Sequence, residues 1–179
     1  MQTSTIVTAL VVAAASATAA VGVPRLMQRQ RQDEALRELP RLVRSASVYF
    51  VKPRMDIKTG QRTACAFPNG EIRTTLAKSC CDPAIGMGDG LCDPTKVEWN
   101  RTLWAALKWK VAEPHAFVYA YQASGTLDAA KFTASAYGDA DCDGVYATFR
   151  YTGKGGAASR MDDCIITEAA DFEAINPDE

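Results

Sequence analysis

Small and apolar residues dominate the start of the chain, where residues 1–24 contain no charged side chain. Within this stretch, residues 5–23 combine valine, leucine and isoleucine with many alanines, a composition compatible with a helix. Roughly 20 apolar residues span a bilayer, so the stretch is long enough for a membrane anchor. Small residues also allow close contact between helices. We therefore expect residues 1–24 to form an apolar helix for membrane insertion or polymerisation.

A helical period continues beyond Pro24, with arginines and glutamines opposite the apolar positions. The pattern predicts an amphipathic helix over residues 25–52, continuous with the first helix and bent at Pro40. It should end near Phe50, ahead of Pro53. The apolar face consists of Leu26, Leu36, Leu39, Leu42, Val43, Ala46 and Phe50.

The rest of the chain, residues 53–179, reads as a globular head. Glycines and prolines punctuate residues 53–98, which predicts Cys-rich loops. Asn100 is a candidate cap for a short helix that carries Leu103, Trp104 and Leu107.

Alternating aromatic and small residues over 115–167 predict an antiparallel sheet, with strands in HAFVYAYQ, AKFTASAY and VYATFRYT and a short one in CIIT. The predicted fold class is therefore α+β: a long N-terminal helix, apolar and then amphipathic, packed on a small antiparallel sheet with disulfide-stapled loops.

The even number of cysteines changes this picture by indicating an oxidising compartment. Structural zinc is disfavoured, because the chain has one adjacent cysteine pair and a single histidine. Six cysteines allow fifteen disulfide connectivities. A bond between Cys142 and Cys164 is our preferred partial prediction, with the other four cysteines stapling the Gly/Pro-rich middle. The candidates are Cys65, Cys80, Cys81, Cys92, Cys142 and Cys164.

Charge is distributed unevenly along the chain. Residues 25–54 hold eight Lys/Arg and three acids, whereas residues 162–179 hold seven acids and no Lys or Arg. Because the basic stretch follows an apolar segment directly, it indicates a juxtamembrane cluster, and we predict no nucleic-acid partner.

The sequence GDADCDG contains the clearest local motif. Alternating Asp139, Asp141 and Asp143 ahead of Gly144 are typical of a loop that wraps oxygen atoms around calcium. The twelfth position of such a loop should be a bidentate glutamate, but it is Arg150 here. The alternative is an acidic β-turn between two strands, which the missing glutamate favours. Calcium is the only cofactor that the sequence suggests.

No set of residues predicts catalysis. His115 has no serine or cysteine motif to partner it, so we expect a structural histidine and no enzyme. The three tryptophans are expected in the core, because Trp104 lies on an apolar helical face.

Two parts of the chain resemble a known family. AAVGVP followed by RLMQRQRQDEALRELPRLVRSASVYF is similar to type IV pilins and the pseudopilins of type II secretion. The matching positions are Pro24, Gln30, Glu34, Ala35, Leu39, Tyr49 and Phe50. The later segments WNRTLWAAL, EPHAFVY and DADCDG also look like those of pilin-like proteins.

This resemblance implies a structural subunit of a type IV pilus or a type II secretion pseudopilus. A minor subunit is one form that the resemblance allows. Its partners would be other pilin or pseudopilin subunits and the inner-membrane assembly platform. It would lie in the inner membrane through residues 5–23, with its head in the periplasm, or in an assembled filament.

Two features depart from the family. No basic leader ending in glycine precedes the apolar segment, and Val7 stands where members usually carry a glutamate. By the positive-inside tendency, Arg25 and the arginines after it predict a cytoplasmic head, whereas the cysteines predict the opposite side. An upstream basic leader would reconcile the two.

Two other functions compete with the pilin interpretation. In a secreted disulfide-bonded binding domain, the N-terminus would be a signal peptide cleaved after an A-x-A site such as the one ending at Ala19. An extracellular enzyme would need a convergent catalytic set.

Overall fold

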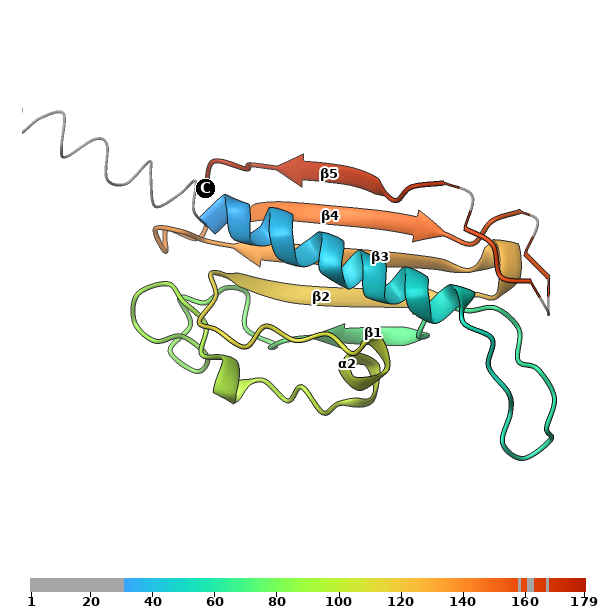
Figure 1. Ribbon diagram of the computed structural model, residues 1–179. Helices are drawn as coiled ribbons and strands as arrows, with labels where there is room; N and C mark the ends of the chain where they lie inside the picture. Colours follow the sequence, from blue (N-terminus) through green and yellow to red (C-terminus); the bar gives the residue numbers. More distant parts are fainter. Residues whose placement is uncertain (1–30, 158, 161–162, 167) are drawn as a thin grey trace, which may run out of the picture.

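A computed structural model describes residues 31–157, 159–160, 163–166 and 168–179. The chain is helical from residue 31 to residue 51, and Pro40 lies within this helix. Figure 1 shows one continuous helix that runs across a face of the sheet. The predicted stop between Phe50 and Pro53 is confirmed. Residues 1–24, and with them the apolar helix, lie outside the described residues.

The sheet has five strands in the order β1-β2-β3-β4-β5, and every neighbouring pair is antiparallel. Residues 117, 119 and 121 of β2 point to the helix side and are buried, as their alternation predicts. The strands are β1 (Gly70–Arg73), β2 (Phe117–Ser124), β3 (Lys131–Gly138), β4 (Ala147–Lys154) and β5 (Asp171–Ile175).

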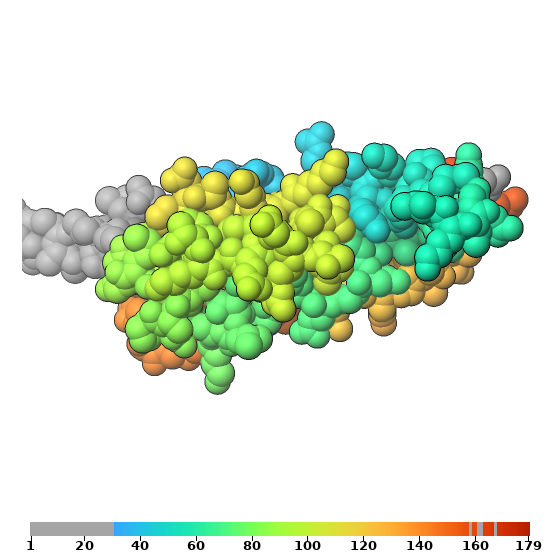
Figure 2. Space-filling view, turned by 90° about the horizontal axis from the view of Figure 1, so that it is seen from below, coloured from blue at the N-terminus to red at the C-terminus, as the bar shows by residue number. Residues whose placement is uncertain are grey.

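Within the described ranges, three short helical turns lie outside the sheet: η1 (Pro94–Lys96), α2 (Thr102–Leu107) and η2 (Leu127–Ala129). The N-cap of α2 is Arg101, with no side-chain cap, so the prediction that Asn100 caps this helix is wrong. Figure 2, viewed from the β1 side, shows the chain between β1 and β2 in green to yellow over most of this face.

One hydrophobic core joins the helix to the sheet. Leu39, Leu42 and Phe50 are fully buried, as predicted, whereas Leu36 is 45 % exposed, so its predicted place on the apolar face is wrong. Phe50 stacks on Phe67 with ring centroids 4.6 Å apart, and Phe67 meets Phe132 of β3 at 4.7 Å. Phe67, which precedes β1, thus connects the end of the helix to the sheet.

The fold-class prediction is wrong in the form stated above. The described chain is a five-stranded antiparallel sheet with one substantial helix, residues 31–51, and the long two-part N-terminal helix is not shown. The sheet also reaches beyond 115–167, since β1 comes from the Cys-rich region and β5 from the C-terminus. Residues 164–166 of CIIT form no strand.

The disulfides also differ from the partial prediction. Cys65 bonds to Cys164, Cys80 to Cys92 and Cys81 to Cys142. Cys142 and Cys164 are therefore not partners, and only the Cys80–Cys92 bond lies wholly within the Gly/Pro-rich middle. The other two bonds tie this middle to the second half of the sheet, because each joins segments more than 60 residues apart.

Candidate functional site

The Asp139–Gly144 loop joins β3 to β4 at the end of the molecule where the described helix begins (Figure 1). The chain turns here through two left-handed residues, Cys142 at φ 63° and Gly144 at φ 93°. Glycine adopts this conformation without steric cost, which accounts for its place in the motif. Both flanking elements are strands, so the loop is not part of a helix–loop–helix.

The turn brings the three predicted aspartates together. One carboxylate oxygen from each of Asp139, Asp141 and Asp143 lies within 4.8 Å of the others. Asp141 accepts a hydrogen bond from the Asp143 amide at 3.3 Å, and Asp143 accepts one from the Val145 amide at 2.7 Å. These bonds are typical of an Asx turn, so the β-turn interpretation accounts for much of the geometry.

Asp139 differs from its two neighbours because it is buried, with 5 % of the residue exposed. Its Oδ2 accepts a hydrogen bond from the Gly144 amide at 3.2 Å, while Oδ1 has no partner among the described residues. A buried carboxylate oxygen without a donor costs about 1–3 kcal/mol or more. The turn alone therefore leaves one strong acceptor unsatisfied in a residue whose carboxylate belongs to the Asp cluster.

Contacts from distant segments hold the loop in place. The Cys81–Cys142 disulfide fixes its centre to the loop that follows β1. At the start of the helix, the Arg31 guanidinium donates hydrogen bonds to the carbonyl oxygens of Ala140 and Asp89. The aspartates are consequently presented on a tethered backbone, which lowers the entropic cost of binding an ion.

A fourth acid lies beside the aspartates, at the C-terminal Glu179. Its pKa is raised, first by desolvation and then by the negative charges of Asp143, Asp141 and Asp139. Sequence reasoning missed this residue, because it is 36 positions beyond Asp143 and no local pattern links them. The Gln32 side chain holds the tail here by donating a hydrogen bond to the Pro177 carbonyl.

These groups fit a hard cation that takes oxygen ligands, such as calcium. Asp139, Asp141 and Asp143 would hold it, with Glu179 close enough to add charge. Arg150, at the twelfth position of the loop, lies in β4 and pairs with Glu173 at 3.0 Å, so it belongs to the sheet.

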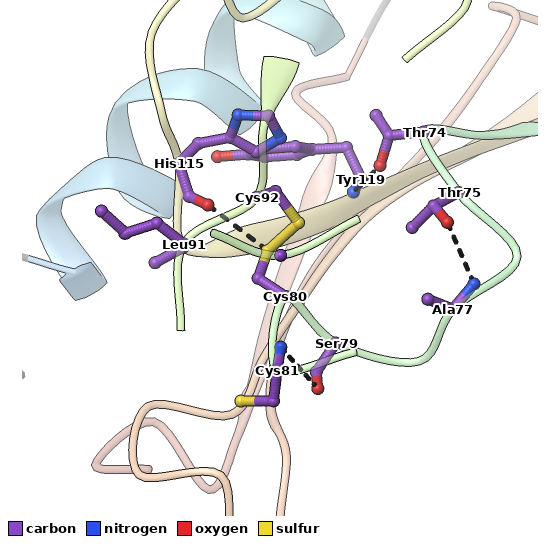
Figure 3. Close-up of a disulfide and its surroundings, with 12 residues drawn as sticks. Thr74, Thr75, Ala77, Ser79, Cys80, Cys81, Leu91, Cys92, His115 and Tyr119 are labelled. Atoms are coloured by element: carbon purple, nitrogen blue, oxygen red, sulfur yellow. Dashed lines mark hydrogen bonds between the residues drawn. A yellow bond between two sulfur atoms is a disulfide. The ribbon is translucent and has the colours of Figure 1, made fainter. Parts of the chain in front are cut away.

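His115 lies in a separate, buried cluster. Its ring packs beside Tyr119 with centroids 6.0 Å apart, next to the Cys80–Cys92 disulfide (Figure 3). Nδ1 is 3.0 Å from the Glu113 carbonyl oxygen, and Nε2 has no hydrogen-bond partner among the described residues. Burial lowers the pKa of His115. Both neighbouring sulfur atoms are in a disulfide, so this arrangement offers no free thiol as a nucleophile.

The tryptophans lie in the core, as expected. Trp104 and Trp109 are buried with ring centroids 5.2 Å apart, and Trp99 packs against both.

A hydrogen-bonded link between helix and sheet was not predicted. The Glu34 carboxylate accepts hydrogen bonds from the Ala116 amide at 2.9 Å and the Tyr119 hydroxyl at 2.8 Å. One turn later, Glu38 is buried and pairs with Arg41 at 2.7 Å. A signal was present in the sequence: glutamates four positions apart border the apolar stripe of the helix.

No family model, curated protein or solved structure matches the chain. Within the described residues, no helix has the length and apolar character needed to cross a bilayer. Residues 5–23 lie outside that part of the chain.

Proposed function

We propose that the protein is a pilin-like structural subunit of a type IV pilus or a type II secretion pseudopilus. Its role would be assembly, with no catalytic step. Other pilin or pseudopilin subunits and the inner-membrane assembly platform would be its partners. The chain would be held in the inner membrane through residues 5–23 before assembly, with its disulfide-bonded part in the periplasm.

One observation carries this proposal: four of the positions that resemble the pilins, Glu34, Ala35, Leu39 and Phe50, attach the helix to the sheet. Ala35, Leu39 and Phe50 are fully buried, and Glu34 bonds to Ala116 and Tyr119. A family motif that served only to bind lipid or solvent would not require these contacts. The three disulfides support an oxidising compartment such as the periplasm.

The state of the N-terminus tests the proposal. Cells that express the protein are fractionated, and the intact mass and first residue are determined in the membrane, sheared-filament and soluble fractions. A chain that keeps residues 5–23 and is found in membranes or filaments supports the proposal. A soluble chain that begins near Ala20 or Val21 contradicts it and supports the secreted binding domain.

We further propose that the Asp139–Gly144 loop binds calcium. The observation that favours it over a bare acidic turn is the buried, unpartnered Oδ1 of Asp139. A bound cation would satisfy this oxygen and offset the repulsion among the acids around it. It would thereby stiffen the end of the subunit where the described helix begins.

The full-length chain in detergent provides the calcium test. Ligand that binds only the folded state stabilises it by about 2.7 kcal/mol at 100 times its Kd, so millimolar calcium should raise Tm by several degrees. Asp139→Asn should abolish the shift, whereas Asp128→Asn, an exposed aspartate in η2, should retain it. An unchanged Tm with calcium or chelator in the parent chain would leave the loop as a turn.

A further inference from the structure

A groove with a strongly basic lining runs between the second half of the helix and the segment after α2. Its volume is about 620 Å³, and no Asp or Glu lines it among the described residues. Leu107, Trp109 and Val48 contribute apolar surface. Five cationic side chains surround them, and we call the set the basic groove: Arg41, Arg44, Lys52, Arg54 and Lys108.

Among the described residues, only Arg41 of these five cations has an acidic partner. Arg41 pairs with Glu38, and Arg54 donates hydrogen bonds to the Tyr49 and Ala66 carbonyl oxygens. Arg44, Lys52 and Lys108 form no ion pair among the described residues, and all three are exposed. The groove is therefore a concave surface with uncompensated positive charge and an apolar floor.

The opposite end of the molecule carries the complementary charge. Glu179 and Asp178 lie beside the Asp139–Gly144 loop, where the charges of its three aspartates act on Glu179. None of the acids forms an ion pair within the described chain, and Val145 among them is 41 % exposed. We call this set the acidic end: Asp139, Asp141, Asp143, Asp178 and Glu179.

We infer that the basic groove of one subunit receives the acidic end of a second copy of this chain. Opposite charges at the two surfaces would guide the contact, and Val48 and Val145 would supply an apolar contact at its centre. A lipid surface is a poorer fit, because Val48 lies about 24 Å along the helix axis from Gln32, far from where the proposed anchor joins.

This contact is heterologous, since the two surfaces are different and lie at opposite ends of the helix (Figure 1). Heterologous contacts that do not close into a ring produce open helical assemblies. The inference rests on the proposed function and deepens it by naming the surfaces through which neighbouring subunits touch.

A photo-crosslinking amino acid at Val48, which is 55 % exposed in the groove, tests the contact directly in the full-length chain. We expect crosslinked dimers and ladders, with the attachment mapped by mass spectrometry to residues 139–146 or 171–179. At about 0.5 M salt the Debye length falls to a few ångströms, so the yield should drop severalfold. The same probe at Leu76, which is 94 % exposed outside the groove, should give no ladder.

Reversing the charges on each surface distinguishes loss of a specific contact from misfolding of the variant. Lys52→Glu with Lys108→Glu, and separately Asp178→Lys with Glu179→Lys, should each reduce the Val48 crosslink at least tenfold, because like charges then face each other. Mixing the two variants, with the probe on the Lys52/Lys108 variant, should restore it. The matched control, Lys78→Glu with Lys131→Glu, makes the same change in net charge on exposed residues outside the groove.

Crosslinks to another face of the second copy, to lipid or to nucleic acid would overturn the inference, as would a variant mixture that fails to restore the ladder. These outcomes are distinct from failure of the proposed function, because the fraction of the chain in sheared filaments is measured on the same cells. Filaments without this crosslink reject only the contact. A soluble, cleaved chain rejects the pilin proposal itself.

Discussion

Glu34 connects the helix to the sheet through a single carboxylate. Its two oxygens accept hydrogen bonds from the Ala116 amide and the Tyr119 hydroxyl. Ala116 lies just before β2, and Tyr119 lies within it. Burial raises the pKa of Glu34, and the two hydrogen bonds oppose this shift. At this position the fold therefore holds an acid in a site that disfavours its charge.

The raised pKa has a defined effect on stability. Because the folded state holds the Glu34 proton more tightly, its contribution is greatest below the ordinary value of 4.5 and is lost as pH rises through the raised pKa. Glu34→Gln should remove this dependence, because an amide does not titrate. Its carbonyl oxygen can still accept from the Ala116 amide, and its NH2 group can donate to the Tyr119 hydroxyl oxygen. Glu34→Ala should lower the free energy of unfolding by about 1–3 kcal/mol at acidic pH, because both partners lose their acceptor, and by less at pH values above the raised pKa.

Urea unfolding at a series of pH values measures both variants of Glu34. Asp33→Asn is the matched control, since Asp33 is next to Glu34 in the sequence and its side chain is exposed. This change should alter neither the urea midpoint nor the dependence of the unfolding free energy on urea. A Glu34→Ala chain as stable as the parent would show that the link carries no energy.

The pKa of His115 is lowered, so the effect of pH on stability is opposite to that of Glu34. Burial lowers its pKa from 6.5, with partial opposition from the Glu113 carbonyl and the charge of Glu38. The neutral ring is favoured in the folded state, so the free energy of unfolding should fall as pH drops from about 6.5 through the lowered pKa. His115→Gln, made in the Glu34→Gln background, should flatten this decline. No other histidine can contribute, because the chain has only this one.

The helix over residues 31–51 depends on a narrow stripe of contacts. Ala35, Leu39, Leu42, Ala46 and Phe50 are all fully buried at helical spacing. Its outer face is polar apart from a few exposed residues such as Leu36 and Val51. Helical stability in such an element comes mainly from packing of the buried face.

Two leucines of this helix provide an internal comparison. Leu39→Ala should lower the free energy of unfolding by about 2–5 kcal/mol, because it opens a cavity between helix and sheet. Leu36→Ala, three residues earlier and 45 % exposed, should stay within about 0.5 kcal/mol of the parent. Equal losses, measured by chemical denaturation, would contradict the assignment of the buried face.

Local periodicity made much of this architecture predictable. The buried stripe at Leu39 and Leu42 and the alternation in β2 are visible in the residues themselves. The short strands β1 and β5 were not predicted, because four or five residues carry little pattern and β5 is exposed throughout. In the candidate site the Asp triad was predictable from its spacing, whereas Glu179 and the Cys81 partner arrive from distant parts of the chain.

At the scale of the whole molecule, disulfides connect regions that the sheet alone leaves separate. Cys65–Cys164 joins residues 99 positions apart, and Cys80–Cys92 closes a segment of only 12. A crosslink stabilises mainly by restricting the unfolded chain, and it does so more for longer loops.

The two bonds should therefore contribute unequally. Replacing Cys65 and Cys164 by alanine should cost about 4–5 kcal/mol, against about 3 kcal/mol for Cys80 and Cys92. The first variant should also show a larger dependence of unfolding on urea, because its unfolded state exposes more surface. A larger loss from the Cys80–Cys92 pair would indicate that packing around this disulfide outweighs its short loop.

The Cys65–Cys164 bond also limits how far the subunit can lengthen under tension. When the chain is pulled from residue 31 and from its C-terminus, only segments 31–65 and 164–179 can be drawn out, because the disulfide bypasses everything between them. Their contour length is about 170 Å, compared with about 500 Å for the reduced chain. A fibre built from such subunits would resist stretching after its domains had yielded, and a reductant would make it roughly three times more extensible.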